Sequence, residues 1–122
     1  MTKEAALLNF FSSFRIPAYV STAVPEDAKF PYITYENVID NWDTSVSITV
    51  NIWYRTESEK EPNTKARELS AAIGLGGRLI ECDGGVIWLK RGTPWCQSVR
   101  DEDDILIKRR YINVTAQYFT MN

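Results

Sequence analysis

The side chains that could carry out chemistry are carboxylates, serines and two cysteines, because the 122-residue chain contains no histidine. The lack of histidine removes the commonest general base and metal ligand, and it excludes a Ser-His-Asp triad. Glu36, Asp40 and Asp43 could pair their carboxylates for hydrolysis, but such pairs need a fixed separation that nothing in the sequence defines. No nucleophile motif flanks a serine or cysteine. The sequence therefore predicts no catalytic residue and no enzyme.

The most charged stretch is a run of four carboxylates, Asp101, Glu102, Asp103 and Asp104. Their oxygens could bind a divalent cation, but the run lacks the glycine and the spacing of a calcium loop. A solvated loop between strands is the alternative. The basic run Lys108–Arg110 follows closely and could pair with these carboxylates, within one chain or across a subunit boundary. We expect no metal ion here.

Two other patterns could suggest phosphate binding. Gly74-Leu75-Gly76-Gly77 follows a helical pattern and leads into a strand, whereas a phosphate-binding loop follows a strand and opens a helix. A turn after a helix is therefore the interpretation. Side chains along Lys108–Arg110 alternate between two faces of a strand, so they form only a weak basic patch. Together with a net charge of -2, this argues against a protein whose main role is to bind nucleic acid. We expect no cofactor.

The cysteines and the first residues bear on location. Cys82 and Cys96 are too few for the disulfide framework of a small secreted protein. Neighbouring strands could bring them into a bridge, but we favour two half-buried thiols in a reducing cytoplasm. The N-terminus lacks the pattern of a signal peptide, and no apolar run approaches the roughly 18 residues that span a bilayer. We expect a protein that is made in the cytoplasm, with no membrane contact.

Two helices are expected in a chain whose length fits one domain, residues 1–122. The first begins after an N-cap at Thr2 and has one apolar stripe formed by Leu7, Phe10, Phe11 and Phe14. The second ends at Ile73, with Gly74 as the residue after it. Its start is ambiguous, because Ser58 has capping-box spacing to Glu61 while Pro62 is typical of a first helical residue.

The remaining residues indicate strands and their connections. Residues 17–31 hold three prolines and predict a surface connection. The alternation of side chains is clearest over Val46–Arg55. Asp83-Gly84-Gly85, between two apolar runs, predicts a hairpin. The expected strands cover 32–38, 46–55, 78–82, 86–90, 95–99 and 106–119.

Helices and strands do not alternate strictly, which disfavours a doubly wound parallel sheet. We therefore predict a single α+β domain with a mixed or mostly antiparallel sheet and both helices on one face. The other face would carry Ser, Thr, Asn and Arg and could meet water or a neighbouring subunit. Trp53 lies on that polar face of its strand, and Trp42 lies in the preceding loop, where it could instead plug a core edge. Both are candidate interface anchors.

The whole pattern resembles the small tail-terminator and tail-completion proteins of long-tailed bacteriophages, including the lambda-type terminator. The segments that carry the resemblance are Phe30-Pro31-Tyr32-Ile33-Thr34-Tyr35, the strand Val46–Tyr54, the helix Thr64–Ile73 and the final strand Arg110–Ala116. The resemblance covers nearly the whole chain, but it lies in size, element order and strand texture. It includes no catalytic motif.

The resemblance implies a structural role in the virion. Such proteins assemble as a ring, usually of six copies, on the head-proximal end of the tail tube. The ring stops tube growth and provides the surface that joins the head connector, and DNA passes through its lumen without specific binding. We hypothesise that the acidic run Asp101–Asp104 faces the lumen or a ring mouth, where it would repel phosphates. The alternative function is a small cytoplasmic protein-binding module that acts through its polar sheet face.

Overall fold

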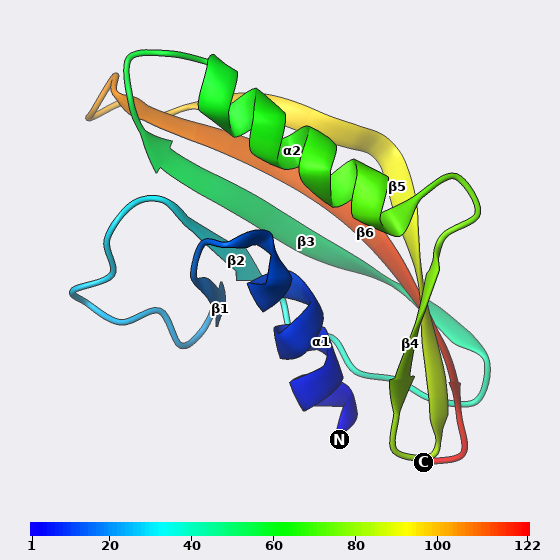
Figure 1. Cartoon of the computed structure of the whole chain (residues 1–122). Helices are drawn as coiled ribbons and strands as arrows, with labels where there is room; N and C mark the ends of the chain where they lie inside the picture. Colours follow the sequence, from blue (N-terminus) through cyan, green and yellow to red (C-terminus); the bar gives the residue numbers. More distant parts are fainter.

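Six strands form one curled sheet in the order β1-β2-β3-β6-β5-β4, and both helices pack against the same face of it (Figure 1). Only β1 and β2 are parallel, so the predicted mixed and mostly antiparallel α+β domain is confirmed. The computed structural model describes all of residues 1–122. In chain order the elements are α1 (Lys3–Phe11), a 3-10 turn (Ser12–Phe14), β1 (Ala18–Val20), β2 (Tyr32–Tyr35), β3 (Thr44–Arg55), α2 (Lys60–Ile73), β4 (Arg78–Cys82), β5 (Gly85–Arg100) and β6 (Ile107–Thr120).

The helix α1 forms where the sequence predicts it. The Thr2 hydroxyl caps it by accepting a hydrogen bond of 3.1 Å from the Ala5 amide. The helix ends at Phe11, and the chain tightens into the 3-10 turn before Arg15 reverses it with a φ of 65°. The whole predicted stripe is buried, with Phe14 contributed by the turn rather than by the helix.

The helix α2 resolves the ambiguity about its start. It begins at Lys60, and the Ser58 hydroxyl accepts a hydrogen bond of 3.0 Å from the Lys60 amide, so the capping box with Glu61 does not form. Pro62 is the third helical residue rather than the first. At the other end Gly74 has a φ of 77°, which glycine adopts at little cost, and this confirms the predicted stop.

The core lies between the helices and the inner face of the sheet. Strand β3 pairs with β6 over its full length, from Thr44 opposite Tyr118 to Arg55 opposite Ile107, so the alternating side chains of the two strands align in cross-strand rows. The rows that face the helices are apolar and buried. They are formed by Ile48, Val50, Ile52, Ile112, Val114, Ala116 and Tyr118, against Leu7 and Phe11 of α1 and Leu69 and Ile73 of α2.

Three strand predictions need correction. The strand expected over 32–38 ends at Tyr35. The segments 86–90 and 95–99 are one strand, β5, with a bulge that places Arg91 opposite Val114 but Cys96 opposite Ile112. Gly92 and Pro94 lie in this bulge. Residues 18–20 of the predicted connection form β1, a three-residue strand too short to show any alternation.

The two cysteines are free thiols at separate places in the sheet. Cys82 pairs with Gly85, which lies opposite Thr120, whereas Cys96 lies opposite Ile112. Eight positions of β6 at roughly 3.3 Å each separate the two places, which is beyond the reach of a disulfide. Burial raises the pKa of both thiols.

Candidate interaction surface

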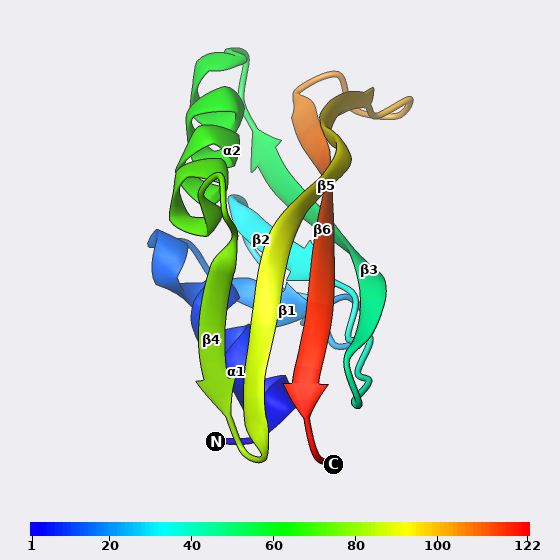
Figure 2. The same ribbon diagram turned by 90° about the vertical axis from the view of Figure 1, so that its right-hand side faces the viewer.

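The outer face of the sheet carries no helix, as Figure 2 shows from the side. Its centre is built from the alternate residues of the same strands whose other side chains form the core. These outward side chains are polar, with one aromatic ring at Tyr111, and are Ser45, Ser47, Thr49 and Asn51 of β3 and Tyr111, Asn113, Thr115 and Gln117 of β6. Ser45 and Ser47 are exposed and the others are half-buried, so the face is partly open to a partner.

One corner of this face carries an aromatic row, which we define as Tyr19, Tyr32, Trp53 and Arg109. The ring centroids lie 5.9 Å apart for Tyr19 and Tyr32 and 6.2 Å apart for Tyr32 and Trp53. The Arg109 guanidinium lies 5.2 Å from the Trp53 centroid, within cation–π range. The Trp53 indole also donates a hydrogen bond of 2.9 Å to the Thr34 hydroxyl. The row is thus held in place before any partner arrives.

The structure brings Trp53 and the acidic run together. A groove of about 290 Å³ is lined by Trp53, Arg109 and three of the four predicted carboxylates, Asp101, Glu102 and Asp103. Trp42 is not part of it. Its amide donates to the Thr120 carbonyl, 3.1 Å away, at the opposite end of β3, and its side chain is 67% exposed, so it does not plug the core.

Only part of the charge of the acidic run is free. The Asp101 carboxylate accepts hydrogen bonds from the Asp103 and Asp104 amides at 2.8 and 2.9 Å, which fixes the turn. The Arg55 guanidinium donates to the Asp104 carboxylate at 2.9 Å, and this hydrogen bond holds the pKa of Asp104 below its ordinary value. Glu102 and Asp103 are exposed and form no ion pair within the chain.

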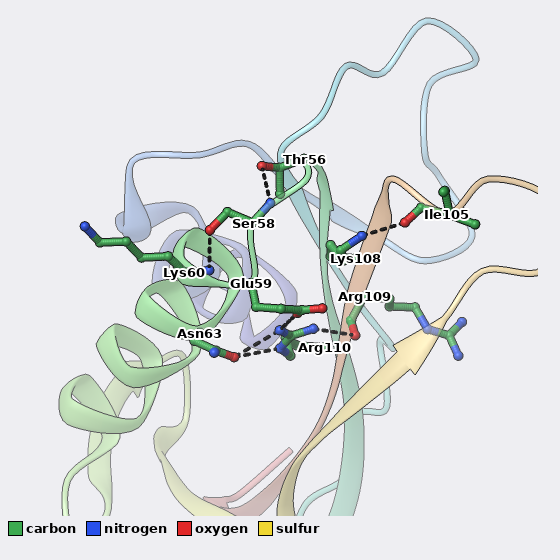
Figure 3. A network of polar contacts seen from close by, with 9 residues as sticks. All are labelled: Thr56, Ser58, Glu59, Lys60, Asn63, Ile105, Lys108, Arg109 and Arg110. Carbon is green, nitrogen blue, oxygen red and sulfur yellow. Dashed lines mark hydrogen bonds and ion pairs between the residues drawn. The ribbon is translucent and has the colours of Figure 1, made fainter.

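The basic run that follows divides between the two faces of β6 (Figure 3). Arg110 points toward α2, where its guanidinium donates to the Asn63 amide oxygen at 3.0 Å and to the Glu59 carboxylate. Arg109 points away from it, toward the outer face. Lys108 donates to the Ile105 carbonyl at 2.5 Å. Pairing between the basic and acidic runs within one chain is therefore wrong, because Arg55 of β3 is the partner of Asp104.

A second groove has no counterpart among the residues predicted from the sequence. We call it the basic groove and define it by Leu75, Trp88, Lys90, Arg91 and Trp95. It encloses about 580 Å³ beside the loop that follows α2, and no carboxylate lines it. The Lys90 ammonium lies 4.1 Å from the Trp88 centroid, and the indole donates to the Gly76 carbonyl at 3.0 Å. The spacing of Trp88 and Lys90 on one strand face was the available signal.

The carboxylates considered for hydrolysis are each held locally. The Asp40 carboxylate accepts from the Asn41 amide at 2.8 Å, and that of Glu36 accepts from the Thr49 amide at 3.0 Å. Asp43 accepts from the Gln117 side chain at 2.5 Å. The structure has no group of three carboxylates or thiols arranged to hold a metal ion, and neither helix has the length and apolar character needed to cross a membrane.

No family model matches the chain, and a search of curated proteins finds no match.

Proposed function

We propose that this chain is a structural, non-enzymatic protein of a long-tailed phage that forms a ring, of six copies, at the head-proximal end of the tail tube. The ring would end tube growth and join the tail to the head connector. The observation that carries this proposal is the uncovered outer face of the sheet, with its preformed aromatic row. An uncovered face with fixed aromatic and arginine side chains is typical of a protein interface.

Unsatisfied polar atoms on the same face support a role in association. The Asn51 side-chain oxygen and the Arg109 Nε are buried and have no hydrogen-bond partner within the chain. Both residues point outward from the neighbouring strands β3 and β6. Buried polar groups without partners are uncommon in folded proteins, and a partner that reaches this face could satisfy them.

The open edges of the sheet also support assembly. Strands β1 and β4 are the two edges and differ in length, with three and five residues, so one edge does not mirror the other. Contacts between unlike surfaces are heterologous and produce closed rings when the rotation between copies closes. In such a ring DNA would pass through the lumen without specific binding, in keeping with the net charge of -2.

Electron microscopy of tails tests this proposal. We expect the phage or prophage whose genome encodes this chain to produce overlong or unjoined tubes when the gene is deleted. Purified protein added back should restore uniform length, and it should appear as a ring at the head-proximal end. Tails of normal length and normal attachment in the deletion would contradict the proposal. A monomer that binds another cytoplasmic protein and leaves tails unchanged would favour the binding module instead.

A further inference from the structure

Two surfaces of this chain complement each other in charge and shape, although they lie too far apart to meet within one copy. The first is the acidic tip, which we define as residues 101–105, between β5 and β6. The second is the basic groove. The tip follows the end of β5, and the groove lies along the middle of the same strand. Because the strand between them is extended, the tip cannot fold back into its own groove.

The acidic tip is shaped to enter another molecule. It projects past the N-terminal end of α2 in Figure 1 and to the side away from both helices in Figure 2. The hydrogen bonds of Asp101 and the ion pair of Asp104 hold its backbone, so Glu102 and Asp103 are presented without partners. Ile105 is 68% exposed beside them. The tip therefore offers two free carboxylates and one apolar side chain.

The basic groove offers the matching chemistry. Lys90 and Arg91 are its only charged side chains, and both donate to neutral groups, Lys90 to the Gln117 amide oxygen at 3.2 Å and Arg91 to the Ser70 hydroxyl of α2 at 2.9 Å. The lining therefore carries two positive charges, directed to opposite faces of β5, and no negative one. Leu75, at the rim, is 96% exposed, and the rings of Trp88 and Trp95 supply an apolar wall. Tryptophan and arginine are the side chains that most often dominate binding energy at interfaces.

We propose that the acidic tip of one copy docks in the basic groove of the next, with Glu102 and Asp103 against Lys90 and Arg91 and with Ile105 against Leu75. The contact joins unlike surfaces, so repeating it generates a ring or an open chain of copies. The proposal rests on the proposed function for the identity of the assembly. In this proposal the acidic tip lies at the subunit interface and not in the lumen of the ring. Arg55, Arg100 and Arg109 lie close to the carboxylates of the tip and weaken the repulsion between the tip and DNA phosphates.

Charge reversal of the two surfaces tests the docking. The tip variant carries Glu102→Lys with Asp103→Lys, and the groove variant carries Lys90→Glu with Arg91→Glu. Each variant alone would place like charges at every contact, and we expect its self-association, measured by sedimentation velocity at high protein concentration, to weaken more than roughly tenfold. A 1:1 mixture restores opposite charges at every contact, and alternating copies close a ring of six, so we expect the mixture to assemble like the wild type.

A matched control carries the same charge change elsewhere. Glu26→Lys with Asp27→Lys alters two exposed carboxylates of the connection before β2, and we expect wild-type association. Rescue by mixing also shows that both variants fold, because a misfolded chain could not restore assembly. Raising the ionic strength should weaken the wild-type contact, since exposed charges are screened.

The outcomes separate this inference from the proposed function. Either variant that assembles alone as well as the wild type would overturn the docking, as would a mixture that stays dissociated. If the variants also restore tail length to the deletion phage, the docking fails while the terminator role stands. If mixing rescues assembly but the wild-type protein has no effect on tails, the docking stands and the terminator role fails. A wild-type chain that stays monomeric in solution and at tube ends would overturn both.

Discussion

The two faces of strands β3 and β6 have opposite characters although alternate residues of the same strands form them. The inner face holds Ile48, Val50 and Ile52, all fully buried under the helices. The outer face holds Ser47, Thr49 and Asn51 between them, with no layer above. The comparison indicates that burial of the inner face supplies the folding stability. The other face can change its side chains at little cost to the fold, which leaves it free to serve a partner.

A matched pair of leucine substitutions should give the largest contrast between a packed and an open surface. Leu69→Ala removes a fully buried side chain of α2 and leaves a cavity, so we expect the free energy of unfolding to fall by about 2–5 kcal/mol. Leu75→Ala removes a side chain that is 96% exposed, and a change within about 0.5 kcal/mol is expected. Urea unfolding of both variants measures this. If the two variants lost equal free energy of unfolding, Leu75 would have to be buried in solution.

The ion pair between α2 and the inner face should give an intermediate effect. Arg110 is only 2% exposed, whereas Glu59 is largely exposed. Glu59→Gln removes the charged partner and leaves the guanidinium with Asn63 and the Arg109 carbonyl, so we expect a loss of about 1 kcal/mol. Glu57→Gln changes an exposed carboxylate without an ion pair and serves as the control. An unchanged denaturation midpoint in Glu59→Gln would show that Arg110 needs no charged partner.

The acidic tip should give the smallest effect, and a pH dependence reveals it. The pKa of Asp104 lies below its ordinary 3.8, so the folded state favours its charged form. The stabilisation is therefore present at neutral pH and is lost as the pH falls through this lowered pKa. In an NMR titration the Asp104 carboxyl should titrate below 3.8, and Arg55→Gln should raise its pKa toward that value. An unchanged titration in Arg55→Gln would assign the shift to the Leu106 amide instead.

Most of the fold could be predicted because its signals are local. The alternation of Val46–Arg55, the stripe of α1 and the glycine turn of the β4–β5 hairpin each depend on neighbouring residues, and each is confirmed. The strand β1 escaped prediction because its pairing with β2 is a tertiary contact between parallel strands, with no alternation of its own. The bulge in β5 escaped for a similar reason, since only the partner strand shows that it is no break.

The site was predictable in its parts but not in its arrangement. Trp53 and the acidic run were selected by residue type, and their meeting in one groove depends on the long register of β3 with β6. Trp42 was selected by the same reasoning and lies at the other end of that strand. The basic groove joins the loop after α2 to the middle of β5, and no sequence spacing encodes that contact.

The bulge of β5 has a geometric consequence for any assembly of this chain. It lies between the two surfaces that would dock, because the basic groove surrounds it and the acidic tip follows the end of the same strand. Gly92 approaches the backbone of Asn113 so closely that a methyl group there would lie 2.9 Å from its carbonyl oxygen, so any larger residue would force the bulge to shift. In a head-to-tail contact this bulge would set the turn from each copy to the next, so one glycine would govern how many copies complete the circle.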